Sequence, residues 1–333
     1  MTTTIPTGDH RRLTTPFHAR TTAAEIVDGV DLSGRRIVVT GGASGIGAET
    51  VRALAAAGAE VTIATRDPAL AEPLLRELAA VPGAGAVRAA ALDLADLSSV
   101  AAFAREWRGP LDVLVANAGI MALPTRRITL EGWELQLATN HLGHFALATW
   151  LHGSLREAGS ARLVVVSSGA HLLSPFDFDD PQFERRPYDP WTAYAQSKTA
   201  DVLFAVGAGR WASDGITANA LAPGWIHTRL SRHLDEETMR ALGAMDDDGN
   251  LVEPPHYKSP AQGAATSVLL AASPLVAGVT GRYFEDNQEA AIARGDEEMP
   301  SGVAAYALDP EAGDRLWEYA TAALHDSGAG PAR

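Results

Sequence analysis

The sequence predicts one α/β domain built on a doubly wound parallel sheet of about seven strands, with helices on both faces. Short apolar runs rich in β-branched residues alternate with segments of helical periodicity along most of the chain. The 333 residues are 46% hydrophobic, which is ample for one large buried core. We find no internal repeat and no linker that divides the chain. Such an unbroken alternation predicts a single sheet of parallel strands.

The elements are expected in the following order. Arg-Ile-Val-Val-Thr at 36–40 is a buried strand that stops at glycines, and helical spacing of apolar residues follows until Gly58. A second strand is expected at 61–65. Further strands are expected at 86–92, 111–116, 162–167, 216–221 and 281–286, and helices at 69–79, 97–107, 129–152, 191–212 and 260–272. Strands and helices that alternate in this way give a Rossmann-type sheet.

Two extensions are expected to flank this domain, which we place at residues 35–290. Residues 1–34 are polar and interrupted by prolines, with one short helix predicted at 22–30. Residues 291–333 contain a predicted terminal helix at 309–325. Within the domain, the loops at about 169–190 and 223–258 are the candidates for substrate binding.

Charge and composition exclude several classes of protein. With 27 basic and 41 acidic residues the formal net charge is −14, which argues against a broad surface for nucleic acid or an anionic membrane. The sequence has no cysteine, so disulfides, thiolate metal sites and cysteine nucleophiles are excluded. It shows no secretory signal and no run of about 18 apolar residues, so no membrane span is expected. We expect a cytoplasmic protein.

A glycine-rich turn, Thr-Gly-Gly-Ala-Ser-Gly-Ile-Gly, occupies residues 40–47 directly after the first strand. Among Gly41, Gly45 and Gly47, one glycine allows a sharp turn, another lets a pyrophosphate approach backbone N–H groups, and the last permits close packing of helix on sheet. The helix that follows points its N-terminus at the phosphates. A tight turn without a ligand is the alternative, but the strand-helix context favours a bound dinucleotide.

The second strand ends in Thr65-Arg66, at the place where the adenosine ribose of a dinucleotide lies. An acidic residue there would bind a 2′-hydroxyl, whereas the planar guanidinium of Arg66 suits a 2′-phosphate. NADP(H) is therefore favoured over NAD(H) as the cofactor. The alternative is a surface arginine beside Asp67.

Lysine is rare in this chain, because only Lys198 and Lys258 are lysines among the 27 basic residues. A lysine kept in such a sequence indicates a site that arginine cannot serve. Lys198 follows Tyr194 by four residues, and on a helix this spacing places both side chains on one face, one turn apart. From this stretch alone, a chance pair on the surface is the alternative.

Taken together, these residues resemble the short-chain dehydrogenase/reductase family. Its motifs occur in family order between residue 35 and about 286: Thr40 to Gly47, Asp93-Leu94, Asn117-Ala118-Gly119, Asn140, Ser167-Ser168, Tyr194-x-x-x-Lys198 and Pro223-Gly224. Seven motifs in order are highly specific. The stretches 139–145 and 258–264 are most similar to the branch that contains retinol dehydrogenases and the WW-domain oxidoreductase.

The resemblance implies where the cofactor binds. Asp93 would bind the adenine edge, residues 117–119 would form the floor under the adenosine ribose, and Thr228 would lie near the nicotinamide carboxamide. The full implied set is Gly41, Ser44, Gly45, Ile46, Gly47, Arg66, Asp93, Leu94, Asn117, Ala118, Gly119, Tyr194, Lys198, Pro223, Gly224 and Thr228. From the residues alone, Asp93 could simply cap the next segment, and residues 117–119 could be an ordinary loop exit.

The resemblance also implies a catalytic set of Asn140, Ser168, Tyr194 and Lys198. Reduction of a carbonyl needs a proton donor, and free tyrosine, with a pKa of about 10, is too weak an acid at neutral pH. The compact ammonium of Lys198 can supply a stabilising charge and also bind ribose hydroxyls, for which a guanidinium is too broad. Ser168 would hold the carbonyl oxygen, although Ser167 competes because neighbours on a strand face opposite sides. Asn140 would kink its helix and hold a water in a proton relay.

The predicted function is an NADP(H)-dependent oxidoreductase that interconverts a carbonyl and an alcohol. A non-catalytic NADP(H)-binding regulator and an epimerase or dehydratase are the alternatives. No metal is expected, because His141 and His144 lack the further ligands that a metal site needs, and both are expected to pack or to form hydrogen bonds. The family resemblance favours a homodimer or homotetramer.

A bulky hydrophobic substrate is expected from the loop at 169–190, which contains Phe176, Phe178, Phe183 and Tyr188. A second wall would come from Trp225, Ile226 and Leu230, before an acidic, glycine-containing segment at 245–250 that could act as a lid. The alternative is that the aromatic residues anchor the loop or form a subunit interface.

Overall fold

A computed structural model describes residues 11–295 and 301–330, so both predicted extensions lie partly outside the described residues. Eight strands form one sheet in the order β3-β2-β1-β4-β5-β6-β7-β8, and all neighbours are parallel except β7 and β8. The strands are β1 (Arg36–Thr40), β2 (Glu60–Thr65), β3 (Val87–Ala91), β4 (Val113–Ala116), β5 (Ala161–Val166), β6 (Ile216–Ala222), β7 (Arg282–Glu285) and β8 (Gln288–Glu289). The predicted doubly wound sheet is confirmed, and a short eighth strand extends it.

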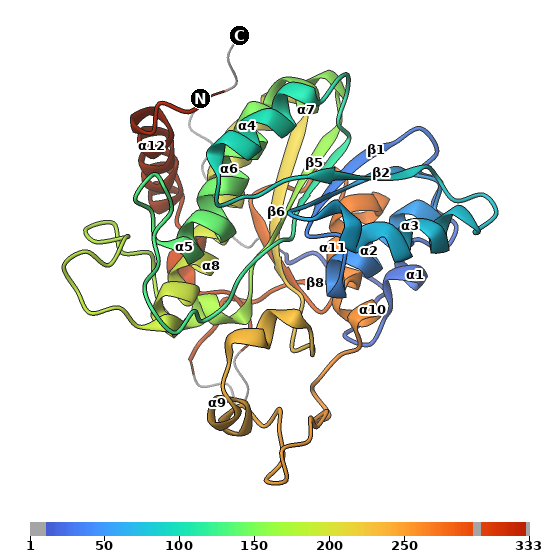
Figure 1. The fold of residues 1–333 in the computed structure, drawn as a ribbon. Coiled ribbons are helices and arrows are strands. Elements are labelled where there is room, and N and C mark those ends of the chain that lie inside the picture. Colours follow the sequence, from blue (N-terminus) through green and yellow to red (C-terminus); the bar gives the residue numbers. More distant parts are fainter. Residues whose placement is uncertain (1–10, 296–300, 331–333) are drawn as a thin grey trace.

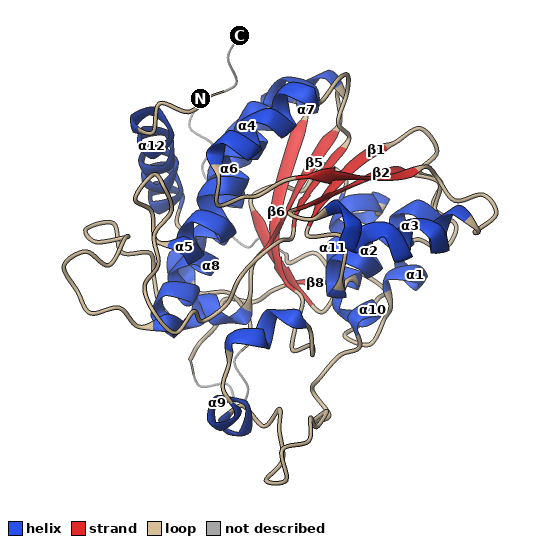
Figure 2. Ribbon diagram, in the orientation of Figure 1, coloured by secondary structure: helices blue, strands red, loops and turns tan. Residues whose placement is uncertain are grey.

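Helices cover both faces of this sheet (Figures 1 and 2). One layer contains α1 (Ala23–Ile26), α2 (Gly45–Ala56), α3 (Glu72–Ala79), α10 (Pro260–Gly263) and α11 (Ala265–Ala272). The other contains α4 (Leu97–Glu106), α5 (Leu135–Leu137), α6 (Gly143–Trp150), α7 (His152–Glu157), α8 (Pro190–Gly207) and α12 (Pro310–Asp326). Along β1, Ile37 and Val39 enter one apolar core and Val38 enters the other. Burial on both faces explains why β1, β4 and the other central strands are almost continuously apolar.

The strand order places the candidate site. After β1 the chain builds outward through β2 and β3, then returns to add β4 on the other side of β1. In open α/β sheets, ligands bind beyond the carboxyl ends of the strands at such a reversal of order. The turns after β1, β4, β5 and β6 therefore meet at one edge of the sheet.

The predicted helix at 129–152 differs from the structure. It begins only at Leu135, because an antiparallel bridge between Ile128 and Glu134 closes a turn, and the Glu134 carboxylate then accepts hydrogen bonds from the next helical N–H groups. A π-helical segment, η2 (Ala138–Leu142), interrupts it. The helix predicted at 191–212 ends at Gly207 and continues as the 3-10 segment η4 (Ala208–Asp214), while the helix predicted at 22–30 is only the single turn of α1.

Segments outside the sheet close over its edges. The backbone and side chain of Thr15 are hydrogen bonded to Gln288 and Asn287, which fastens the N-terminal segment beside β8. The helix α12 packs against α8. After β6 the segment containing η5 (Arg229–His233) and α9 (Glu236–Ala241) projects from the body (Figure 1). No helix within the described residues is both long and apolar enough to cross a membrane.

Candidate active site

The glycine turn after β1 is shaped so that only glycine fits. Gly41 and Gly45 have positive φ angles of 66° and 55°, which side chains disfavour. A Cβ placed on Gly47 would lie 2.4 Å from the carbonyl oxygen of Gly41, so the turn closes tightly on itself. A Cβ on Gly45 would lie 3.3 Å from Cγ2 of Thr228, which places Thr228 over the turn. The glycine turn and Thr228 therefore lie close enough together to contact one cofactor, as the sequence predicts.

The start of α2 suits an anion. Ser44 is the N-cap residue, yet its hydroxyl forms no capping hydrogen bond, and the first turn carries no acidic residue. The free N–H groups and positive end of a helix of this length favour a phosphate. Ile46 packs below, 3.4 Å from a Cβ placed on Gly263. The residues present therefore fit a pyrophosphate without rearrangement.

The turn after β4 is held to the turn after β1 by one threonine. Thr40 Oγ1 accepts hydrogen bonds from the backbone N–H groups of Asn117 and Ala118, each 2.9 Å long. The Asn117 side chain in turn donates to the Thr40 carbonyl oxygen at 2.8 Å. Residues 117–119 are thus part of the same rigid edge as the glycine turn, rather than an independent loop.

His144 completes this network. Its Nδ1 lies 2.8 Å from the Asn140 carbonyl oxygen and its Nε2 lies 2.8 Å from Thr40 Oγ1. Because a carbonyl can only accept, Nδ1 carries the proton and Nε2 accepts from Thr40. Burial lowers the pKa of His144 to about 4, which keeps the ring neutral as this pattern requires. The prediction of a hydrogen-bonded histidine is confirmed.

Asn140 lies in the π-helical segment, so the predicted kink is present. Its Oδ1 accepts from the Ile120 backbone N–H at 2.9 Å, and its Nδ2 donates to the Ile120 carbonyl and to Ser197 Oγ at 3.0 and 2.9 Å. Both amide hydrogens are therefore used within the protein. The side chain positions the loop after Gly119 against α8 and has no hydrogen left to donate to a relay water.

The two serines after β5 face different neighbours. Ser167 is buried and donates its hydroxyl to the Lys198 carbonyl oxygen at 2.7 Å. Ser168 accepts a hydrogen bond from the Ala170 backbone N–H at 3.2 Å, at the start of η3 (Gly169–Leu173), and keeps its own hydroxyl proton. Ser168 is therefore the serine that can still donate to a substrate oxygen.

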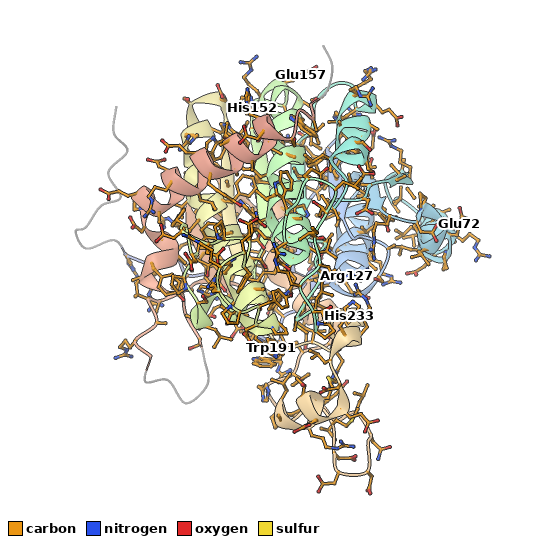
Figure 3. All side chains as sticks on the ribbon, turned by 60° about the vertical axis from the view of Figure 1, so that its left-hand side comes forward. Glu72, Arg127, His152, Glu157, Trp191 and His233 are labelled. Atoms are coloured by element: carbon orange, nitrogen blue, oxygen red, sulfur yellow. The ribbon has the colours of Figure 1, made fainter. Side chains whose placement is uncertain are left out.

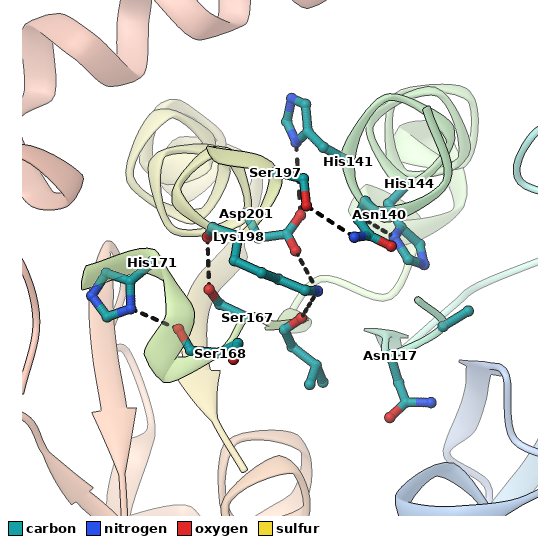
Figure 4. Close-up of polar contacts among 12 residues, drawn as sticks. Asn117, Asn140, His141, His144, Ser167, Ser168, His171, Ser197, Lys198 and Asp201 are labelled. Carbon is teal, nitrogen blue, oxygen red and sulfur yellow. Dashed lines mark hydrogen bonds and ion pairs between the residues drawn. The ribbon is translucent and has the colours of Figure 1, made fainter. Parts of the chain in front are cut away.

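Tyr194 and Lys198 lie one turn apart on α8, with the Lys198 ammonium 5.9 Å from the centre of the tyrosine ring. Lys198 Nζ donates to the Val166 carbonyl oxygen at 2.9 Å and to Asp201 Oδ2 at 2.8 Å (Figure 4). Tyr194 is only 3% exposed, so its phenol lies within the protein rather than on the surface.

Gly119 shows that these motifs meet. A Cβ placed on Gly119 would lie 3.2 Å from Asn140 Oδ1 and 3.8 Å from Lys198 Nζ. One small volume is therefore bordered by Gly119, Asn140 and Lys198. A side chain at Gly119 would therefore crowd the Asn140 amide and the Lys198 ammonium.

The remaining residues predicted to bind the cofactor lie at the same edge of the sheet. Several of them already form hydrogen bonds or packing contacts within the protein. Asp93 Oδ1 accepts from the Ala95 backbone N–H at 3.0 Å, so the carboxylate does cap the following turn. Leu94 is buried, and its carbonyl lies against Gly143. Gly224 has a positive φ of 99°, and Lys258 binds the Pro223 carbonyl at 3.2 Å. The second lysine of the chain thus fastens the turn after β6.

The aromatic residues of the loop at 169–190 pack on one another and on α12. Phe176 and Phe178 pack on each other, and Phe176 also packs on Tyr319 of α12. Phe183 is buried against Tyr188, whose hydroxyl donates to the Leu123 carbonyl at 3.1 Å. Phe176 and Phe183 are buried and anchor the loop, which favours the alternative for these two rings, whereas Phe178 and Tyr188 are half-buried.

The sequence prediction missed two neighbours of Tyr194 and Lys198. Trp191, labelled in Figure 3, lies edge-to-face with Tyr194 at 6.3 Å between ring centres. Asp201 pairs with Lys198. Trp191 stands three residues before Tyr194, and Asp201 stands three residues after Lys198, so helical spacing places each beside its partner. Spacing alone does not distinguish such a contact from ordinary helix packing. No group of three or more potential metal ligands is found within residues 11–295 and 301–330.

The sheet and its glycine turn are those of a dinucleotide-binding α/β protein. A family model described as short chain dehydrogenase matches residues 35–239. A protein named "Probable oxidoreductase" from Streptomyces antibioticus is 74% identical over 295 residues, which cover 89% of this chain and 99% of that protein. Retinol dehydrogenase 14 of Homo sapiens is 37% identical over 304 residues, which cover 86% of this chain and 85% of that protein.

Among solved structures, the RhlG/NADP active-site complex of Pseudomonas aeruginosa is 27% identical, with a TM-score of 0.58 over 77% of this chain and 96% of that chain. The protein belongs to the short-chain dehydrogenase/reductase family of oxidoreductases. The predicted likeness to retinol dehydrogenases is confirmed among its relatives.

Proposed function

We propose that this protein is an NADP(H)-dependent oxidoreductase that interconverts a carbonyl and an alcohol on a bulky hydrophobic substrate. The observation that carries the proposal is the meeting of Gly119, Asn140 and Lys198 beside Tyr194, at the edge that also holds the glycine turn. The bound cofactor supplies or accepts the hydride. The pyrophosphate would be held by the Gly41–Gly47 turn and the start of α2, and the nicotinamide end by Thr228, Lys198 and the Pro223–Gly224 turn.

The protein supplies the proton. In reduction, the Tyr194 hydroxyl donates its proton to the substrate oxygen, and the Lys198 ammonium stabilises the phenolate that remains. Ser168 donates a hydrogen bond to the same oxygen and fixes its position. Asn140 keeps the Gly119 loop against α8 and so positions the lysine. In oxidation, the phenolate of Tyr194 accepts the proton of the alcohol.

The preference for NADP(H) rests on Arg66, which follows β2 and is exposed. Arg232, from the segment after β6, lies near it, since burial and then the charge of Arg66 lower the pKa of the Arg232 guanidinium. Two guanidinium groups at the end of β2 favour a dianionic 2′-phosphate over a neutral hydroxyl. The related RhlG binds NADP.

Replacing Arg66 with alanine should weaken NADPH binding about tenfold to a hundredfold, because a charge-assisted phosphate contact contributes about 1.5–3 kcal/mol. Affinity for NADH should barely change. Fluorescence titration of both cofactors measures this, with Arg88→Ala as the matched control, since Arg88 lies on β3 beside Trp107. An equal loss for both cofactors would mean that Arg66 supports the fold or the pyrophosphate.

The substrate class rests on apolar side chains near the site and on one relative. Trp191 contacts Tyr194, and Trp225, directly after the Pro223–Gly224 turn, is 38% exposed. Leu173, at the end of the η3 segment that Ser168 begins, is 66% exposed. Retinol dehydrogenase 14 is named for a hydrophobic alcohol. With Phe176 and Phe183 buried, these exposed residues are the candidate substrate walls.

A screen of NADPH oxidation across aldehydes and ketones of increasing apolar size tests the proposed function. Each methylene buried on binding contributes about 0.8 kcal/mol, so kcat/KM should rise about threefold to fourfold per added methylene until the cleft is filled. Trp225→Ala should flatten this rise more than Leu275→Ala, a control on the distant η6 segment (Pro274–Val276). Best activity on small hydrophilic carbonyls would contradict the substrate class.

A further inference from the structure

Asp201 is a buried carboxyl that the proposed mechanism does not use. It lies on α8, only 1% exposed, with Oδ2 2.8 Å from the Lys198 ammonium. Its other oxygen, Oδ1, has no hydrogen-bond partner. The nearest donor is His141, whose Nδ1 lies 3.9 Å away, beyond hydrogen-bond distance (Figure 4). Only one of the two Asp201 carboxyl oxygens is therefore hydrogen bonded within the described residues.

Such a carboxylate is costly to keep charged. Burial raises the pKa of Asp201 to about 7, against the opposing attraction of Lys198. Burial also lowers the pKa of His141 to about 3, so the imidazole is neutral and cannot act as a second cation. Asp201 is therefore easier to protonate than an exposed carboxyl.

The other ionisable groups around α8 leave Asp201 with one strong electrostatic partner. On α8 itself the side chains of Tyr194 and Lys198 share its face, at seven and three residues' distance. The neighbouring π-helical segment and α6 contribute His141 and His144, both with lowered pKa values.

The remaining ionisable neighbours of α8 lie on other faces. His171 on η3 contacts Tyr283 on β7, and the His171 carbonyl accepts a hydrogen bond from Thr199 of α8. From η7 (Ala305–Leu308), Tyr306 binds the same His171 carbonyl, and α12 presents Gly313 and Trp317 to the far end of α8.

The pair of Asp201 and Lys198 therefore has two charge states. With Asp201 ionised, the net charge beside Tyr194 is close to zero, because the carboxylate offsets the ammonium at 2.8 Å. With Asp201 protonated, the full positive charge of Lys198 acts on the phenol. Lys198 keeps its hydrogen bond to the Val166 carbonyl in either state, so it need not move.

We propose that Asp201 is a proton-linked positioning residue that holds Lys198 in place and sets how strongly the lysine charge acts on Tyr194. Loss of the Asp201 proton weakens the stabilisation of the Tyr194 phenolate, and gain of the proton strengthens it. His141 contributes by excluding water from the second carboxyl oxygen. This inference rests on the proposed role of Tyr194 as proton donor.

The variant Asp201→Asn separates this role from simple packing, because the amide has the same shape and can still accept a hydrogen bond from Lys198. Removing the negative charge stabilises the phenolate, so the alkaline limb of the kcat/KM profile for carbonyl reduction should move to lower pH by on the order of one unit. Asp201→Ser should give the same direction of shift if the amide variant folds poorly. Asp314→Asn is the matched control, since it removes a carboxylate from an exposed pair with Arg210, which stays charged at every pH used. A profile that stays in place or moves to higher pH overturns the proposal.

A second readout needs no substrate or cofactor. A carboxyl whose pKa is higher in the folded than in the unfolded protein makes the fold more stable at low pH, and this stability is lost as pH rises from about 4 to about 7. The melting temperature of the wild type relative to Asp201→Asn should therefore fall across this range, whereas the curve of Asp314→Asn should run parallel to that of the wild type. Parallel curves for Asp201→Asn would overturn the proposal.

The two readouts distinguish the possible failures. If the wild type oxidises NADPH with carbonyls but the pH profiles of wild type and Asp201→Asn coincide, the oxidoreductase function stands and the role of Asp201 is wrong. If no carbonyl is reduced while the melting curves still diverge with pH, the buried proton on Asp201 is real, and the proposed function fails instead.

Discussion

Replacing Tyr194 with phenylalanine should lower kcat for carbonyl reduction about 10²-fold to 10⁴-fold, which is the contribution of a positioned general acid. NADPH should bind with nearly wild-type affinity, because the variant loses only a hydroxyl and leaves Lys198 bound to Val166 and Asp201. Initial rates of NADPH oxidation and a fluorescence titration of NADPH measure the two quantities separately.

Tyr306→Phe is the control for this variant. It also loses only a hydroxyl, which donates to the His171 carbonyl outside the site, so it should lower the melting temperature slightly and leave kcat unchanged. Turnover by Tyr194→Phe within a few-fold of the wild type would show that another group donates the proton.

Lys198→Arg should lose about 10²-fold or more in kcat although it keeps the positive charge. Lys198 is 4% exposed, and its ammonium is held between two acceptors at 2.8 and 2.9 Å, a space that a planar guanidinium exceeds. Overpacking of this kind costs about 1–3 kcal/mol and moves the charge away from Tyr194. Steady-state kinetics and thermal melting of the variant measure both effects.

Lys198→Met provides the comparison, since it keeps the length of the side chain and removes the charge. If shape as well as charge matters, both variants should be severely impaired, and Lys198→Met should also weaken NADPH binding. Lys198→Arg with activity close to the wild type would mean that any cation suffices, and the scarcity of lysine in this chain would then have no bearing on the site.

The central strands could be predicted closely because they are buried on both faces. The run Arg36–Thr40 agrees with β1 to the residue, since only a strand places so many β-branched side chains in two cores at once. The break in the helix predicted at 129–152 could not be predicted from periodicity. Within the π-helical segment, Asn140 donates hydrogen bonds to the Ile120 carbonyl and to Ser197, which lie 20 and 57 residues away.

The candidate site was likewise predictable only in part. Residues that carry a motif, such as Gly47, Tyr194 and Lys198, could be named from the sequence because their chemistry dictates their spacing. The roles of His144 and Asp201 depend on which turn each faces, and helical periodicity does not contain that information. The burial of Phe176 could not be predicted for the related reason that it packs on Tyr319, a partner far along the chain.

The central claim is that Tyr194 and Lys198 support reduction of a hydrophobic carbonyl with hydride from NADPH. Its most direct test is mass spectrometry of the product formed from a bulky apolar aldehyde or ketone with NADPH deuterated at the transferable C4 position. We predict an alcohol with one deuterium on the former carbonyl carbon from the wild type, and almost none from Tyr194→Phe in the same time. Unlabelled alcohol, or an alcohol formed equally well by Tyr194→Phe, would contradict the account.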